Sequence, residues 1–176
     1  MHNILLLDDE ENIVKALKRC LRSVSSWNIE SFTSAREAIR RAKTTTFDIF
    51  ISDYRMPEMN GVDFLSTVKK LQPNSARIIL SGYTDLEALV GAINKAEIFR
   101  FINKPWNDYE LILTIEQSLK YKDMLTENLF LANQVRNQSQ KLEKNEKLFA
   151  QLEKESPGIT HVNWLEDGSI VLEDDV

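Results

Sequence analysis

The chain has 176 residues, 43% of them hydrophobic, which suits one globular domain with an extension and argues against disorder. No apolar run approaches the roughly 18 residues of a membrane span, and the amino terminus lacks a signal peptide's basic region, so we expect a cytoplasmic protein without membrane binding. Charges balance over residues 1–155 and the net charge of -5 lies in residues 156–176, so no basic stripe favours direct nucleic-acid binding.

Short apolar runs alternate with amphipathic segments, which predicts five strand–helix units and an α/β fold. In chain order we expect strand 2–7, helix 10–23, strand 27–33, helix 35–43, strand 47–53, helix 60–71, strand 76–81, helix 85–96, strand 98–102 and a helix from 108. Capping-box spacing supports three of the helix starts, at Ser34 with Glu37, Thr84 with Glu87, and Asn107 with Glu110. Cys20 falls in the apolar pattern of the first helix, so we interpret it as a core residue.

The last helix is predicted to run to about residue 154, because no helix breaker occurs between Trp106 and Pro157. This is longer than one face of a small sheet requires, so the helix should project. Heptad spacing relates Leu131, Val135, Gln138, Leu142, Asn145, Phe149 and Leu152. We predict a parallel homodimeric coiled coil through residues 124–155, weakened by the two polar positions. The alternative is a single solvated helix folded back on the domain.

The acidic tail over residues 156–176 contains two short alternating apolar runs around Asp167 and Gly168, a pattern that favours a β-hairpin. An isolated hairpin is marginally stable and would need a partner surface, with Trp164 and Ile170 or Leu172 as anchors. A frayed tail is the alternative. The two histidines, His2 and His161, show no ligand spacing, and we assign them no role.

Four of the apolar runs end in polar residues that suit phosphoryl chemistry: Asp8 and Asp9, Asp53, Ser81, and Lys104. The carboxyl ends of parallel strands lie along one edge of a sheet, so these side chains should share one crevice. Clustered carboxylates are ligands that Mg²⁺ prefers, and a carboxylate nucleophile with hydroxyl and ammonium donors is what phosphoryl transfer requires. Singly, the aspartates could instead cap the next helix and the serine could begin a turn. The bond preceding Pro105 can adopt the cis form.

The motifs DDE, SDYRMPEMNG, LSGYTD and RFINKPW together resemble the receiver domain of two-component response regulators, and the resemblance covers residues 1 to about 120. It implies a receiver domain over residues 1–122 with a five-stranded, doubly wound, flavodoxin-like sheet in the order 2-1-3-4-5. A helical extension over residues 123–155 follows. The fourth and fifth units are similar to receivers that precede cyclic-di-GMP phosphodiesterases of the HD-GYP type or certain transcriptional activators.

The resemblance also implies the roles of the crevice residues. Asp53 would accept a phosphoryl group from a sensor histidine kinase. Asp9, Asp53 and the backbone carbonyl of Arg55 would ligate Mg²⁺, Asp8 would act mainly through water, and Lys104 would bind the acyl phosphate. The only chemistry implied is this self-catalysed phosphotransfer and dephosphorylation, so the chain is not expected to be an enzyme with an external substrate.

Ser81 and Phe101 would form the switch pair, which reshapes the face made by the fourth helix, fifth strand and fifth helix. Serine stands where threonine is usual in the family, and phenylalanine where tyrosine is frequent. Arg55 and Tyr83 occupy positions that influence the hydrolysis of the acyl phosphate.

The leading hypothesis is a phosphorylation switch that acts by protein–protein interaction, and three alternatives stand beside it. The chain contains no HD pair and no GYP triplet, so the first alternative is the amino-terminal part of a longer regulator. An aspartate-nucleophile hydrolase is the rival from another class, but such enzymes usually carry a second acid where Arg55 stands. A receiver that is no longer phosphorylated is disfavoured, because no member of the reactive set is missing.

Overall fold

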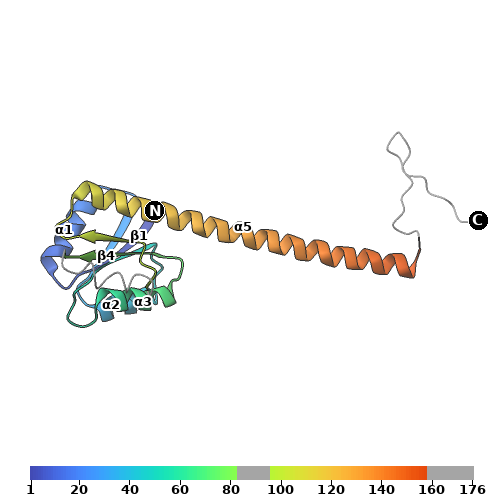
Figure 1. The fold of residues 1–176 in the computed structure, drawn as a ribbon, viewed down its shortest axis with the longest axis horizontal. Coiled ribbons are helices and arrows are strands. Elements are labelled where there is room, and N and C mark those ends of the chain that lie inside the picture. The colour runs from blue at the N-terminus through green and yellow to red at the C-terminus, as the bar shows by residue number, and fades with distance from the viewer. Residues whose placement is uncertain (83–95, 158–176) are drawn as a thin grey trace, which may run out of the picture. The chain divides into compact units, whose positions relative to one another are not determined.

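The computed structural model describes residues 1–82 and 96–157, and Figure 1 shows their arrangement. In chain order the elements are β1 (His2–Leu7), α1 (Glu11–Leu21), β2 (Trp27–Phe32), α2 (Ala35–Ala42), β3 (Ile49–Asp53), α3 (Gly61–Leu71), β4 (Ala76–Ser81), β5 (Arg100–Asn103) and α5 (Asp108–Glu155). Each of these agrees in type with its prediction, and no boundary differs by more than two residues. The helix predicted over 85–96, apart from its last residue, and the predicted hairpin lie outside the described residues.

The five strands form one parallel sheet in the order β2-β1-β3-β4-β5, which confirms the predicted doubly wound topology. All residues of β3 and β4 are buried, and these two strands carry the continuous apolar runs typical of central parallel strands. The two edge strands, β2 and β5, are more exposed and more polar. Sequence hydrophobicity therefore already reflects the position of a strand in the sheet.

Alternating residues of the strands feed two cores on opposite faces of the sheet. Leu5, Leu7 and Phe50 pack with α2 and α3, whereas Ile4, Leu6 and Ile51 pack with α1 and the first turns of α5. Figure 1 shows these helix pairs on the two sides of the sheet. Cys20 lies in the second core, as predicted, and burial raises the pKa of its thiol to about 11.

The helix starts are only partly as predicted. The Asn107 Oδ1 accepts hydrogen bonds from the backbone N–H groups of Tyr109 and Glu110, at 2.9 and 3.2 Å, which confirms the cap of α5. The cap predicted for Ser34 is wrong, because its hydroxyl donates to Glu58 Oε2 at 3.2 Å and makes no capping bond. A tertiary contact thus replaces the local one.

Backbone contacts divide the chain into two compact units, residues 1–127 and 128–176. The strands and the helices that cover them all lie in the first unit, and α5 contributes residues to both. No helix within residues 1–82 and 96–157 combines the length and hydropathy needed to cross a bilayer.

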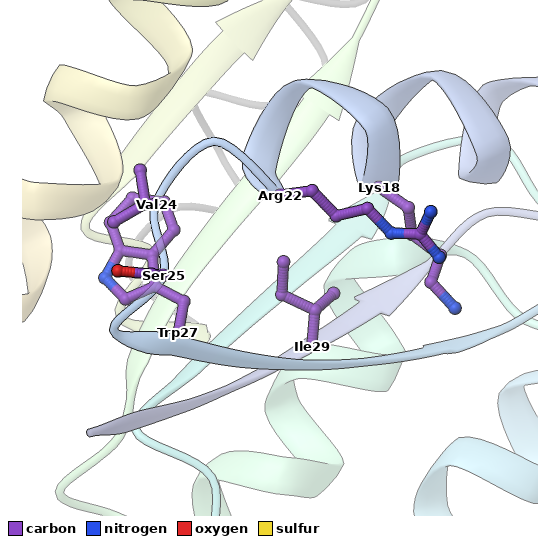
Figure 2. A pocket seen from close by; sticks show the side chains of 6 residues that line it. All are labelled: Lys18, Arg22, Val24, Ser25, Trp27 and Ile29. Carbon is purple, nitrogen blue, oxygen red and sulfur yellow. The ribbon is translucent and has the colours of Figure 1, made fainter.

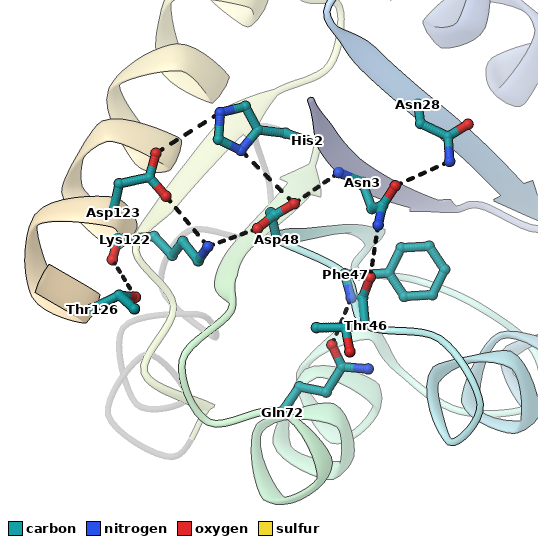
Figure 3. A network of polar contacts seen from close by, with 10 residues as sticks. All are labelled: His2, Asn3, Asn28, Thr46, Phe47, Asp48, Gln72, Lys122, Asp123 and Thr126. Atoms are coloured by element: carbon teal, nitrogen blue, oxygen red, sulfur yellow. Dashed lines mark hydrogen bonds and ion pairs between the residues drawn. The ribbon is translucent and has the colours of Figure 1, made fainter. Parts of the chain in front are cut away.

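A polar network fastens α5 to the amino ends of β1 and β3, opposite the edge where the strands end (Figure 3). Lys122 Nζ lies 2.7 Å from Asp48 Oδ1, and Asp48 Oδ2 accepts the N–H of Asn3 at 2.8 Å. The two ring nitrogens of His2, a residue without an assigned role, each lie 3.8 Å from a carboxylate, one of Asp48 and one of Asp123. Burial opposes the charge on Asp48, but Lys122 and Asn3 outweigh it, so the pKa of this carboxyl is lowered.

We expect Asp48→Asn to lower the free energy of unfolding by about 1 kcal/mol at neutral pH, an estimate discounted for partial exposure. The folded pKa of Asp48 lies below its ordinary value of 3.8, so its stabilisation is complete above that pH and is lost as the pH falls through the folded pKa. The pKa of Lys122 is raised above 10.5, so the pair also weakens at strongly alkaline pH. Urea unfolding of both proteins across the acid range should show the difference shrinking; a constant difference would contradict this.

Candidate functional site

The carboxyl edge of the sheet collects the polar residues at the strand ends. Backbone hydrogen bonds continue the ladders beyond the strands: Asp8 N–H donates to the Phe32 carbonyl at 3.2 Å, and Lys104 N–H donates to the Ser81 carbonyl at 2.8 Å. The Tyr54 N–H, next to Asp53, donates to the Leu80 carbonyl at 2.8 Å. These backbone hydrogen bonds therefore fix the backbone positions of Asp8, Asp53 and Lys104 at the edge of the sheet.

Asp8, Asp53 and Lys104 meet at this edge. Lys104 Nζ lies 2.7 Å from Asp8 Oδ2 and 2.5 Å from Asp53 Oδ1. The second oxygen of Asp8 accepts the N–H of Glu10 at 3.0 Å. Asp8 is fully buried and Asp53 is 6% exposed, so one ammonium group serves two buried carboxylates. The Lys104–Pro105 peptide bond is cis, the form that the sequence allowed.

The electrostatics of this group leave negative charge uncompensated. Burial raises the pKa of Asp53, the neighbouring Asp8 raises it further, and the opposing effects of Lys104 and the Arg55 N–H do not cancel the rise. Burial alone would lower the pKa of Lys104, but its bonds to Asp53 and Asp8 raise it instead. The ammonium is therefore firmly charged, and by formal count it faces two carboxylates, an excess of one negative charge.

This donor set suits a hard divalent cation. The excess charge and the carboxylate oxygens of Asp8 and Asp53 match the preference of Mg²⁺ for oxygen ligands. Asp9, the third carboxylate expected here, is exposed, as is Arg55. Within residues 1–82 and 96–157, no three His, Cys, Asp or Glu side chains are gathered as a metal site. The structure thus brings together two of the predicted carboxylates with Lys104.

The other predicted residues differ in their surroundings. Ser81 is 1% exposed, and its hydroxyl has no hydrogen-bond partner among the described residues. Phe101, by contrast, exposes 44% of its surface. Tyr83 lies outside the described residues. The buried hydroxyl thus ends β4, whereas the exposed ring lies two residues before the end of the neighbouring strand β5, opposite Ile79.

Gly61 is a site residue that the sequence reasoning missed. A Cβ at this position would collide with the Asp53 carbonyl oxygen and would lie 2.9 Å from its carbonyl carbon. The Gly61 N–H also donates to the Tyr54 carbonyl at 2.9 Å. The first turn of α3 therefore lies directly against the backbone of Asp53, a contact that only glycine permits. The signal available in the sequence was the Asn-Gly pair that ends the motif SDYRMPEMNG.

We expect Gly61→Ala to reduce stability by about 1–3 kcal/mol, because the backbone of Asp53 or α3 must shift. It should also slow phosphorylation of Asp53 by acetyl phosphate. Asn60→Ala is the matched control, since it removes the cap bond from the Asp63 N–H to Asn60 Oδ1, 2.9 Å long, without touching Asp53. The control should cost about 1 kcal/mol and leave the phosphorylation rate unchanged. Equal rates in all three proteins would contradict the role of Gly61.

A cavity of about 250 Å³ lies away from this edge, beside α1 and β2 (Figure 2). It is lined by Lys18, Arg22, Val24, Ser25, Trp27 and Ile29. None of these belongs to the carboxylate group, and the volume is below the roughly 300 Å³ at which small-molecule pockets begin. This cavity is therefore separate from the group formed by Asp8, Asp53 and Lys104.

Comparisons with known proteins agree with this geometry. Residues 4–116 match the family model described as the response regulator receiver domain. The hydrogenase transcriptional regulatory protein HoxA of Cupriavidus necator is 35% identical over 66% of this chain and 24% of its own length. The response regulator protein TodT of Pseudomonas putida is 31% identical over 81% of this chain and 62% of its own length. The chain thus spans less than two thirds of either relative.

A solved structure of a receiver domain is also similar to this chain. The signal receiver domain of an HD domain-containing protein from Pseudomonas fluorescens Pf-5 superposes with a TM-score of 0.67 at 32% identity. The superposition covers 72% of this chain and 92% of that one. The similarity therefore extends over most of this chain and nearly all of that receiver domain.

Proposed function

Since the chain belongs to the response regulator receiver family, we propose that it is a phosphorylation switch in which Asp53 accepts a phosphoryl group from a sensor histidine kinase. The observation that carries this proposal is the meeting of Asp8, Asp53 and Lys104 at the carboxyl edge. A carboxylate nucleophile beside a fixed cation is the arrangement that phosphoryl transfer requires. Incubation with acetyl phosphate and Mg²⁺ tests the proposal, because only a phosphoacceptor gains a phosphoryl group.

In the proposed reaction, an Asp53 oxygen attacks phosphorus, so that a P–O bond forms while the bond to the donor imidazole nitrogen breaks. Lys104 then exchanges its bond to Asp53 for one to a phosphoryl oxygen, which stabilises the new charge. Asp53, Asp9 and the Arg55 carbonyl would hold Mg²⁺ directly, and Asp8 through water. When bound, the ion supplies further neutralisation of the phosphoryl oxygens.

The proposed switch uses the contrast between Ser81 and Phe101. The Ser81 hydroxyl is buried and has no hydrogen-bond partner among the described residues, so it is available to donate to a phosphoryl oxygen. Its movement leaves space into which Phe101, now 44% exposed, turns and buries its ring. The surface formed by β5 and α5 thereby changes shape, so that a partner protein can bind the phosphorylated and unphosphorylated forms with different affinity.

The proposed output is a dimeric coiled coil that acts by protein–protein interaction. Within residues 128–157, large apolar side chains are exposed at Leu131, Val135, Leu142, Phe149 and Leu152, which share the predicted heptad seam. A single helix would leave this stripe in water, whereas a second copy covers it. We therefore propose a parallel homodimer through residues 124–155, with the tail as a further contact for the downstream protein.

Light scattering tests the dimer on a matched pair of variants. Leu142→Glu places a charge on the seam and should give the monomer mass. Leu129→Glu changes the same residue type at a non-seam position of similar exposure, 54% against 63%, and should leave the dimer intact. A wild-type chain of monomer mass would defeat the proposal, and so would dissociation of both variants.

A further inference from the structure

Two buried polar atoms without partners lie at the ends of neighbouring strands. Ser81 on β4 and Asn103 on β5 are register partners in the parallel pair. Ser81 Oγ and Asn103 Oδ1 are both buried, and neither has a hydrogen-bond partner among the described residues. Buried polar atoms of this kind are rare in native proteins, so each needs an explanation.

The two atoms are chemically complementary. A serine hydroxyl can donate, whereas the Oδ1 of asparagine can only accept. Register partners on adjacent parallel strands project from the same face of the sheet, and the strands are about 4.8 Å apart. Rotation of the Ser81 side chain about χ1 would therefore move its hydroxyl over this shared face, toward Asn103. Asn103 also directly precedes Lys104, so it is held by the same strand end.

We propose that Asn103 is a positioning residue that competes with the phosphoryl group for the hydroxyl of Ser81. In the resting protein the Ser81 hydroxyl turns toward Asn103 Oδ1, and both orphan atoms gain a partner. On phosphorylation the hydroxyl leaves Asn103 for the phosphoryl oxygen. The Asn103 side chain thereby favours the unphosphorylated conformation and shifts the equilibrium between the two conformations. This inference rests on the proposed function, because it requires that Ser81 responds to a phosphoryl group.

The test is a double-mutant cycle on the full chain, with beryllofluoride plus Mg²⁺ as the phosphoryl mimic. Asn103→Leu removes the acceptor and should tighten beryllofluoride binding by about 2- to 10-fold, the worth of one hydrogen bond. In a Ser81→Ala background, which lacks the donor, the same change should have no effect. In a Ser81→Thr background, which keeps a hydroxyl, the effect should persist.

An unchanged affinity in Asn103→Leu, or an equal change in the Ser81→Ala background, would overturn the inference, since a merely structural residue acts without regard to the hydroxyl. A wild-type protein that fails to bind beryllofluoride would count against the proposed function instead. In that event, urea unfolding without any phosphoryl mimic decides the matter. The two substitutions should then be non-additive, and strict additivity would refute the contact between Ser81 and Asn103.

Discussion

Asp53→Asn should leave the protein folded and abolish its stabilisation by beryllofluoride with Mg²⁺. Asparagine keeps the shape of the side chain but removes the carboxylate oxygen to which the phosphoryl mimic binds. It also removes a buried carboxyl group whose pKa is raised, mainly by burial. We therefore expect the unphosphorylated variant to unfold with at least the free energy of the wild type. Wild-type protein at a ligand concentration of about 100 times its dissociation constant should gain about 2.7 kcal/mol in unfolding free energy. The variant should gain nothing.

Urea unfolding with and without the mimic measures this difference. Asp123→Asn is the control, since it removes a half-exposed carboxylate at the opposite edge of the sheet, and it should retain the full stabilisation. Equal stabilisation of wild type and Asp53→Asn would show that the mimic binds elsewhere.

Lys104→Met should be the most destabilising change at the polar edge. Its ammonium lies within 2.7 Å of two carboxylates that are almost fully buried, and methionine leaves both without a cation. Removing one partner of a buried ion pair costs about 3–5 kcal/mol. Mg²⁺ should restore part of this loss, because a cation that binds the carboxylates replaces the missing charge. Urea unfolding with Mg²⁺ or with a chelator measures both effects.

Lys122→Met is the matched control for this variant. Lys122 also pairs with carboxylates, but its partner Asp48 is more exposed and lies at the amino end of the sheet. The control should lose about 1 kcal/mol and gain nothing from Mg²⁺. A loss in Lys104→Met no larger than in the control, or an equal response of both to Mg²⁺, would contradict the proposed role of Lys104.

The sequence predicted the fold well because parallel sheets leave a strong pattern. The continuous apolar runs of β1, β3 and β4 identify central strands, and their shared direction places the residues that follow them at one edge. The proximity of Asp8, Asp53 and Lys104 follows from this topology alone. The family resemblance added the strand order and the roles of individual residues.

The sequence did not predict three features that depend on tertiary contacts. The capping pattern at Ser34 failed because a glutamate from a distant loop, Glu58, accepts its hydroxyl. The approach of Gly61 to the Asp53 carbonyl requires the path of α3 to be known. His2 lacked any motif, yet it lies between the carboxylates of Asp48, just before β3, and Asp123 on α5. Ser34 and His2 thus have partners far apart in sequence, whereas Gly61 lies only eight residues after Asp53 but approaches it through the fold of the intervening loop.

Peptide mapping by mass spectrometry after incubation with acetyl phosphate and Mg²⁺ tests the central claim most directly. The account predicts one added phosphoryl group, located on the peptide that contains Asp53 and absent when Mg²⁺ is chelated. A protein that acquires no phosphoryl group under these conditions, or that carries it on another residue, would contradict the assignment of Asp53 as the phosphoacceptor.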